Sequence, residues 1–152
     1  MTFPNIFTKE VSDNVIKRIN QLSPSSKAGW GKMNIEQMLA HCNVTYELAY
    51  ENKHPKPNFF MAFIMKTFVK KVVTGNAPYK HNSQTAPAFI IKDKRDFETE
   101  KNRLVNYINK TQQLGEGNFD NKVSPAFGPL NKDEWNTMFY KHLDHHLNQF
   151  AV

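Results

Sequence analysis

The chain has 152 residues, of which 39% are hydrophobic and 22% charged, and its formal net charge at pH 7 is +6. This length supports one domain with a single core and is too short for two comfortable ones. The absence of repeats and low-complexity tracts excludes repeat architectures and extended disorder. We therefore expect residues 1–152 to form one globular domain.

The positive charge comes almost entirely from lysines, because the chain has only three arginines, Arg18, Arg95 and Arg103. Proteins that read nucleic acids usually carry arginine-rich or aromatic-interleaved basic stripes, whereas these lysines are scattered among acidic and amide residues. We therefore expect no nucleic-acid partner. The N-terminal residues lack the regions of a signal peptide, and the lone Cys42 cannot form an intramolecular disulfide, so we expect a cytoplasmic location.

Two helices are predicted in the first third of the chain. Ser12 is a suitable N-cap for the first helix, whose apolar residues follow helical spacing: Val15, Ile16, Ile19 and Leu22. The loop "SPSSKAGWGK" ends it. The second helix begins at "NIEQ", where Asn34 and Gln37 are placed to form a capping box. Its inner face is predicted to contain Met38, His41 or Cys42, Thr45 and Leu48.

The proline-containing stretch "HPKPN" ends the pattern of the second helix. Residues 59–73, "FFMAFIMKTFVKKVV", follow it as an apolar run. Lys66, Lys70 and Lys71 interrupt the run well before the ~20 residues that a membrane span needs. A helix that is buried or faces a partner is favoured over one that lies on an anionic membrane surface, and we expect no membrane partner. The polar connection "TGNAPYKHNSQTAPAF" has the length of a crossover over the surface of a helical bundle.

Two longer helices are predicted in the second half. Residues 93–114 carry one apolar stripe, which consists of Phe97, Leu104, Ile108, and Thr111 or Leu114. The last helix opens with a capping box from Asn131 to Glu134 and runs to about Gln149. No stretch shows a convincing strand alternation. The sequence therefore predicts an all-α bundle of four long helices, with one extra helix in the connection after the second.

Three of the six histidines fall in "KHLDHHLNQF", residues 141–150. At ~100° per residue, the apolar face of this helix is formed by Trp135, Met138, Phe139, Leu143, Leu147 and Phe150. His146 falls near the middle of the face and His142 at its edge, whereas His145 points toward solvent. Because His142 and His146 are four residues apart, they can bind one ion from adjacent helical turns.

His41 shares a face of the second helix with Met38, Thr45 and Leu48 and is therefore also expected to point inward, toward His142 and His146 of the last helix. A buried imidazole without a hydrogen-bond partner costs roughly 1–3 kcal/mol, and convergence on one cation removes this cost. Two interpretations stay open: a metal site formed by His41, His142 and His146, or three separate histidines that are hydrogen-bonded within the core.

Two segments of the chain resemble a known family. "WGKMNIEQMLAHC" and "SPAFGPLNKDEWNTMFYKHLDHHLNQF" resemble segments of the DinB/YfiT-like superfamily of metalloenzymes, and most closely a branch catalogued only as a domain of unknown function. The resemblance implies a four-helix bundle with up-down-down-up topology and a metal site formed by His41, His142 and His146. Ser124 departs from the branch, which often has histidine there, and residues 59–73 are not matched.

A site of three neutral imidazoles leaves the +2 charge of a divalent ion uncompensated and one or more of its coordination positions open. This pattern is typical of catalytic sites. We expect zinc or nickel, although imidazole also suits iron and copper. Similar family members use small thiols such as bacillithiol or mycothiol, so the resemblance implies transfer of a low-molecular-weight thiol to an electrophilic small molecule. Two alternatives stay open: a metal-dependent hydrolase with metal-bound water, and a metal-binding stress or interaction protein without turnover, paired as a homodimer through residues 59–73.

Several other side chains are candidates for the surroundings of the ion. Gln37, Thr45 and Gln149 are placed by the helical wheel to hold its ligands, and Trp30 either walls the pocket or is a simple core residue. A fourth protein ligand would favour a structural site, and the candidates are Cys42, Glu47 and His145. Asp144 lies opposite the core and is not expected to act as acid or base, so no catalytic residue is assigned.

Overall fold

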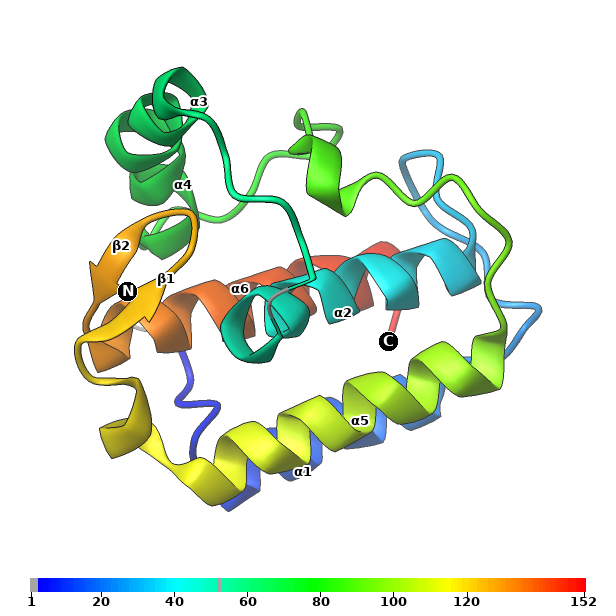
Figure 1. Cartoon of the computed structure of the whole chain (residues 1–152). Helices are drawn as coiled ribbons and strands as arrows, with labels where there is room; N and C mark the ends of the chain where they lie inside the picture. The colour runs from blue at the N-terminus through cyan, green and yellow to red at the C-terminus, as the bar shows by residue number, and fades with distance from the viewer. Residues whose placement is uncertain (1–2, 52) are drawn as a thin grey trace.

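The computed structural model describes residues 3–51 and 53–152 and is mostly helical (Figure 1). Its body consists of four long helices: α1 (Lys9–Asn20), α2 (Ile35–Tyr50), α5 (Phe97–Leu114) and α6 (Lys132–Gln149). α1 and α6 run in one direction and α2 and α5 in the other (Figure 1). α5 and α6 each contact both α1 and α2. The predicted all-α bundle is confirmed.

The helix ends follow local capping chemistry. Asn34 and Asn131 cap α2 and α6 through the predicted capping boxes, in which side chain and backbone bond reciprocally. α1 begins earlier than predicted, because the hydroxyl of Thr8 rather than Ser12 accepts the free backbone N–H. Ser12 is buried inside the helix, where its hydroxyl donates to a backbone carbonyl. α5 begins after Asp96, whose carboxylate caps it.

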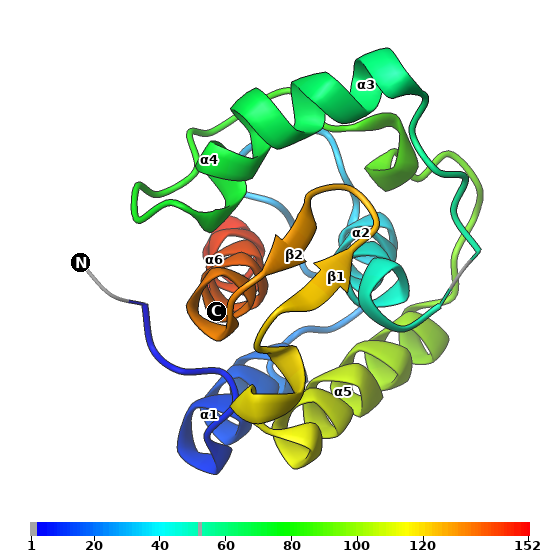
Figure 2. The same ribbon diagram turned by 60° about the vertical axis from the view of Figure 1, so that its left-hand side comes forward.

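The connection after α2 contains the predicted extra helix in three consecutive pieces. These are α3 (Phe59–Ile64), the π-helical turn η1 (Met65–Val69) and α4 (Lys70–Thr74). They lie on the side of α2 and α6 that faces away from α1 and α5 (Figure 2). Lys141 of α6 fixes the end of α4, because its Nζ donates to the carbonyls of Val72, Gly75 and Ala77 at 2.6, 2.5 and 3.3 Å. The chain then crosses to α5 through the 3₁₀ turn η2 (Pro87–Phe89).

The aromatic side chains of this extra helix are not buried. Phe59, Phe60, Phe63 and Phe68 are 91%, 71%, 59% and 64% exposed. Of the two predicted alternatives, the buried helix was therefore wrong and the partner-facing helix stays a prediction, because α4 packs on α6 through its other side, where Val73 lies against the core. Among the described residues, no helix has both the length and the apolar character that crossing a membrane requires.

A short antiparallel hairpin joins α5 to α6, after the 3₁₀ turn η3 (Glu116–Phe119). Its strands β1 (Lys122–Ser124) and β2 (Gly128–Leu130) have three residues each, and Val123 lies opposite Pro129. The sequence did not indicate this hairpin, because three residues are too few to show an alternating pattern.

The core lies between the four long helices and includes the whole predicted apolar face of α6. α2 is the most enclosed of the four, since every residue from Met38 to Glu47 is buried. Leu48, which was predicted on its inner face, is half-buried. Because α2 is covered on nearly all sides, its polar side chains are held inside the protein and must find partners there.

Candidate metal centre

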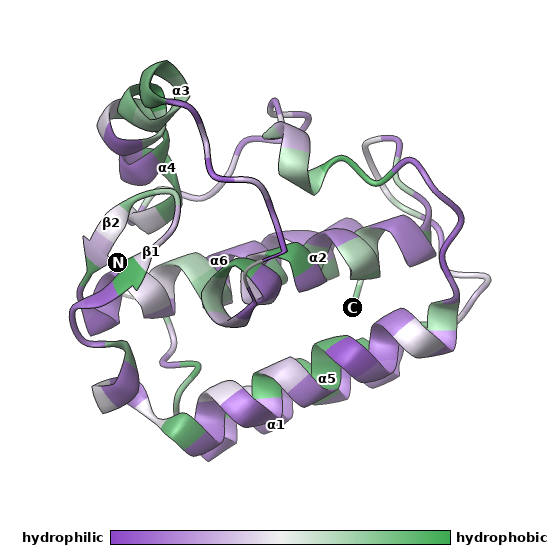
Figure 3. Cartoon of the chain, in the orientation of Figure 1, coloured by the Kyte–Doolittle hydropathy of each residue, from purple (hydrophilic) through white to green (hydrophobic). Residues whose placement is uncertain are grey.

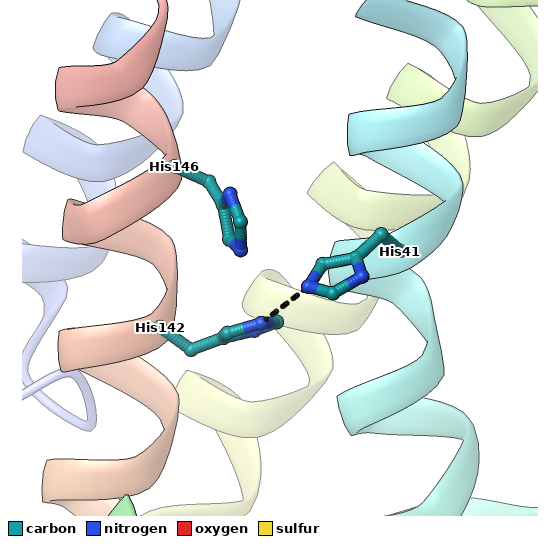
Figure 4. A group of neighbouring side chains, drawn as sticks. All are labelled: His41, His142 and His146. Carbon is teal, nitrogen blue, oxygen red and sulfur yellow. Dashed lines mark hydrogen bonds between the residues drawn. The ribbon is translucent and has the colours of Figure 1, made fainter. Parts of the chain in front are cut away.

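Three histidines meet in the seam between α2 and α6 (Figure 4). His41 comes from α2, and His142 and His146 come from successive turns of α6. One ring nitrogen of each lies within 4.8 Å of the other two, and the Nε2 atoms of His41 and His142 are 2.9 Å apart. His41 and His146 are buried and His142 is half-buried. The structure thus brings together the three histidines that the sequence singles out.

In His41 and His146, the ring nitrogen that faces away from the seam is Nδ1, and its partner is an oxygen atom that can only accept a hydrogen bond. His41 Nδ1 donates to the carbonyl of Phe89 in η2, at 2.9 Å. His146 Nδ1 donates to Oε1 of Gln149 at 2.8 Å, and the Gln149 amide is oriented because its Nε2 donates to the carbonyl of Trp30 at 2.7 Å. A proton on Nδ1 leaves the lone pair on Nε2, so both rings present a lone pair to the seam.

His142 has a partner that supports either tautomer. Its Nδ1 is 3.0 Å from the hydroxyl of Thr45, and a hydroxyl can donate or accept. Without a cation, the Thr45 hydroxyl donates to Nδ1, and the proton on His142 Nε2 goes to the lone pair of His41. With a cation in the seam, the hydroxyl accepts from Nδ1 and all three Nε2 lone pairs are available. The residues present therefore fit a metal ion.

Burial and mutual repulsion keep the three rings neutral. Burial lowers the pKa of His41 despite its bond to the Phe89 carbonyl. Burial also lowers the pKa of His142 well below its usual value, and the neighbouring histidines add to the effect. The pKa of His146 falls to about 3 for the same reasons, burial first and His41 second. Neutral imidazole is the form that binds metal ions.

None of the candidate fourth ligands joins this group in the part of the chain that the structure describes. Cys42 is buried with its Sγ 3.6 Å from the sulfur of Met38, and burial raises the pKa of its thiol. Glu47 is bound to basic side chains on the α5 side of α2. His145 lies beside His146 but outside the group, with ring centroids 5.0 Å apart. Three histidines without a carboxylate or thiolate therefore make up the candidate site.

The prediction that His145 points to solvent was wrong, since this side chain is half-buried. It packs edge-on against the rings of Trp30 and Tyr79, with centroids 5.9 and 5.5 Å away. Trp30 in turn stacks on His81 at 3.8 Å. A small pocket of about 150 Å³ is lined by these four side chains and their neighbours. The loop before α2 and the crossover after α4 cover this side of α6, which a helical wheel cannot foresee.

The other predicted neighbours divide into two groups. Thr45 and Gln149 contact the histidines directly, whereas Gln37 does not. Instead, Gln37 Nε2 donates to the carbonyl of Ile91 at 3.2 Å and so holds the segment that carries the Phe89 carbonyl. Asp144 is paired with Arg18 at 2.7 Å.

The Phe89 carbonyl was missed by sequence reasoning. A backbone oxygen carries no residue-type signal, and its position depends on where a long connection passes.

A comparison with known families finds a match that spans most of the chain. The sequence model described as "Protein of unknown function (DUF1569)" matches residues 6–152, which include all three histidines and the extra helix. No curated protein and no solved structure matches the chain. The family description states no activity, so the chemistry of the site carries the functional argument.

Proposed function

Because the chain belongs to the DUF1569 family, whose description names no activity, we propose a function from the site itself. The protein is a divalent-metal-dependent enzyme in which His41, His142 and His146 hold the ion. It transfers a low-molecular-weight thiol to an electrophilic small molecule. Membership of the DinB/YfiT-like superfamily is part of the same proposal and rests on the sequence resemblance.

One observation carries the metal site: three neutral imidazoles turn their Nε2 atoms toward one another, with no acidic side chain among them. A buried cluster of three bases has lone pairs and no counter-charge, which is the donor set that a transition-metal cation completes. Oxygen partners on the outer nitrogens are typical of metal-binding histidines, because they fix each ring and raise its basicity. Zinc and nickel suit this all-imidazole set, as do iron and copper.

The absence of a fourth ligand among the described residues supports catalysis over a purely structural role. A bound divalent ion would supply Lewis acidity, which lowers the pKa of a thiol or a water molecule beside it. The imidazoles add no negative charge, so they leave this effect undiminished. In the proposed transfer, the thiol gives its proton to solvent water, its sulfur bonds to the electrophilic carbon, and the leaving group departs with the bonding electrons.

The first experiment is elemental analysis of protein purified without a histidine tag, beside the double variant His142→Ala, His146→Ala. We expect the native protein to carry about one transition-metal ion per chain, and the double variant to carry none. His81→Ala is the matched control, since His81 is an exposed histidine outside the group. A native protein that is metal-free and refuses added zinc and nickel would contradict the proposal.

The second experiment tests the reaction with the metal-loaded protein. A bimane halide is incubated with cysteine, coenzyme A or bacillithiol, and thioether formation is measured beside hydrolysis of an activated ester. Thiol-dependent transfer that the double variant lacks supports the proposal. Ester hydrolysis that is indifferent to thiol indicates a metal-dependent hydrolase instead. A metal-loaded protein that is inactive in both assays indicates a metal-binding protein without turnover.

A further inference from the structure

The extra helix presents a continuous apolar stripe to the outside of the molecule. Its members are Phe59, Phe63, Phe68 and Val72, each at least 59% exposed. Phe60, 71% exposed, widens the stripe at its first turn. Figure 3 shows hydrophobic residues along α3 and α4, which lie at the outer edge of the molecule. Contiguous exposed apolar surface of this kind marks an interaction site in most soluble proteins.

The π-helical turn η1 keeps this stripe in line. Phe59 and Phe63 are four residues apart, as are Phe68 and Val72, so each pair shares one side of an α-helix. Phe63 and Phe68 are five residues apart and would diverge in a regular α-helix. The backbone of η1 bonds from Lys70 N–H to the Met65 carbonyl, with the five-residue spacing of a π-turn. The turn thereby aligns two short apolar faces into one.

Basic charge is concentrated around this stripe. Seven lysines and no aspartate or glutamate occur between residues 53 and 92, whereas the whole chain has a net charge of +6. The rest of the chain is therefore close to neutral. Lys66 and Lys71 follow Phe63 and Phe68 by three residues, so both border the same edge of the stripe. Both are exposed, and no ion pair involves them within the described residues.

We propose that this face, defined by Phe59, Phe60, Phe63, Phe68 and Val72 with Lys66 and Lys71, docks on an anionic lipid surface. A helix with phenylalanines on one side and lysines along its border inserts its rings at the boundary of headgroups and acyl chains, while the ammonium groups meet lipid phosphates. The proposal reverses the expectation of no membrane partner, which rested on favouring a helix that is buried or faces a partner.

A second copy of the chain is a poorer occupant for this face. A symmetric contact places the same surface on both partners. The lysines of one extra helix would then meet those of the other, with no acidic residue in either segment to compensate. An anionic lipid surface offers both the apolar layer and the opposite charge.

The test is co-sedimentation of the intact, metal-free protein with vesicles. One set contains phosphatidylcholine alone, and the other contains phosphatidylcholine with one third phosphatidylglycerol. We expect binding to the anionic vesicles that weakens as salt is raised. The phenylalanine double variant carries Phe63→Ser and Phe68→Ser, and the lysine double variant carries Lys66→Gln and Lys71→Gln. Each should weaken binding to the anionic vesicles about tenfold or more. The matched controls are Val123→Ser, an apolar residue 65% exposed on the hairpin, and Lys27→Gln, Lys32→Gln, two exposed lysines outside the segment.

The outcomes separate the proposal from its competitors. Controls that bind as the native protein does, beside phenylalanine and lysine variants that do not, support docking of this face. Equal binding by all variants overturns it, because a generally basic protein would behave in that way. A native dimer that Phe63→Ser, Phe68→Ser converts to a monomer, without vesicle binding, assigns the face to a second copy. Since the assay uses metal-free protein, its result does not depend on the proposed enzyme activity.

Discussion

The two seams that α2 forms with its neighbours hold buried polar side chains in opposite ways. On the α5 side, the carboxylates of Glu47 and Glu100 are buried and surrounded by basic groups. On the α6 side, three histidines meet without any acidic residue in their group. The first seam contains its own counter-charges and needs nothing from outside. The second has three histidine nitrogens and no counter-charge supplied by the chain, which is why a cation is inferred for it.

The α2–α5 seam is a closed network of charges. Arg103 bridges both acids, with an ion pair to Glu47 and a 2.8 Å contact to Glu100. Asn43 donates to the Glu100 carboxylate at 2.8 Å, and Lys53 lies 2.7 Å from Glu47. Burial raises the pKa of Glu47, but hydrogen bonds from Lys53, Arg103 and His54 outweigh burial and hold the pKa below its usual value. Such a network positions α2 against α5 with charges that the chain itself supplies.

Breaking the α2–α5 network should have the largest effect on stability. Arg103→Met removes the shared partner of two buried carboxylates, and breaking a buried ion pair costs roughly 3 kcal/mol. Because Arg103 is partly exposed and other basic groups remain, we expect a loss of about 2–3 kcal/mol in the free energy of unfolding, measured with urea. Lys94→Met, at an exposed lysine just before α5, is the control and should change it little. A metal content unchanged in Arg103→Met would show that the two seams are independent.

Acid should weaken the two seams in different pH ranges. The histidines have folded-state pKa values below the ordinary 6.5. Their contribution to stability is therefore complete above pH 6.5 and is lost as pH falls toward the folded pKa. The pKa of Glu47 is lowered from 4.5, so the ion pairs of Glu47 keep their contribution down to about pH 4.5. Between these values only the histidine seam is affected.

The unfolding free energy of the metal-free protein at pH 7 and pH 5 measures this difference. With a folded pKa of about 3 for His146, the loss at pH 5 from this residue alone is about 2 kcal/mol. His146→Gln should lose less between the same two pH values, since glutamine does not titrate. Equal losses in both proteins would place the acid-sensitive groups elsewhere.

A matched pair of threonines probes the two seams with one chemical change. Thr45 contacts His142 in the histidine seam, and Thr111 contacts Tyr50 at 2.7 Å in the α2–α5 seam; both are buried. Thr45→Val removes the oxygen that orients His142, and loss of such a partner weakens metal binding about tenfold or more. Thr111→Val should leave metal affinity unchanged. Competition with a chromogenic chelator measures both affinities, and a similar loss in both variants would mean that general loosening causes it.

Much of the fold could be predicted because its signals are local. The capping boxes at Asn34 and Asn131 and the apolar spacing in α5 and α6 depend on residues three or four apart, which one helix brings together. The hairpin escaped prediction because its strands are too short to show a period. The exposure of Phe63 escaped it because an apolar helix looks the same in sequence whether or not another element covers it.

The candidate site likewise has features that one helix determines and features that depend on distant parts of the chain. The pairing of His142 with His146 and of His146 with Gln149 follows from spacing within one helix, and the inward positions of His41 and Thr45 follow from the helical wheel. The contact of Thr45 with His142 joins two helices, and the same wheel also placed Gln37 near the ion, which the structure does not bear out. The Phe89 carbonyl and the half-buried state of His145 depend on the path of the long crossover. No spacing rule fixes that path, so these features needed the structure.

Gln37 offers the finest test of how that crossover supports the histidine seam. Its side chain does two things: Oε1 accepts the Asn34 N–H in the capping box, and Nε2 donates to the Ile91 carbonyl. Gln37→Glu keeps the first bond, since glutamate serves equally in a capping box, and removes the second. The Phe89 carbonyl, two residues before Ile91, then loses an anchor while the start of α2 is preserved.

We expect Gln37→Glu to weaken metal affinity two- to fivefold, in keeping with the roughly 0.5–1 kcal/mol that one hydrogen bond contributes. Asn34→Asp, which keeps the cap and does not touch the crossover, should leave the affinity unchanged. If Gln37→Glu matches the native protein, the crossover is held by other contacts and His41 keeps its orientation without this bond. A loss comparable to that of Thr45→Val would instead show that His41 depends on the crossover as strongly as His142 of α6 depends on Thr45 of α2.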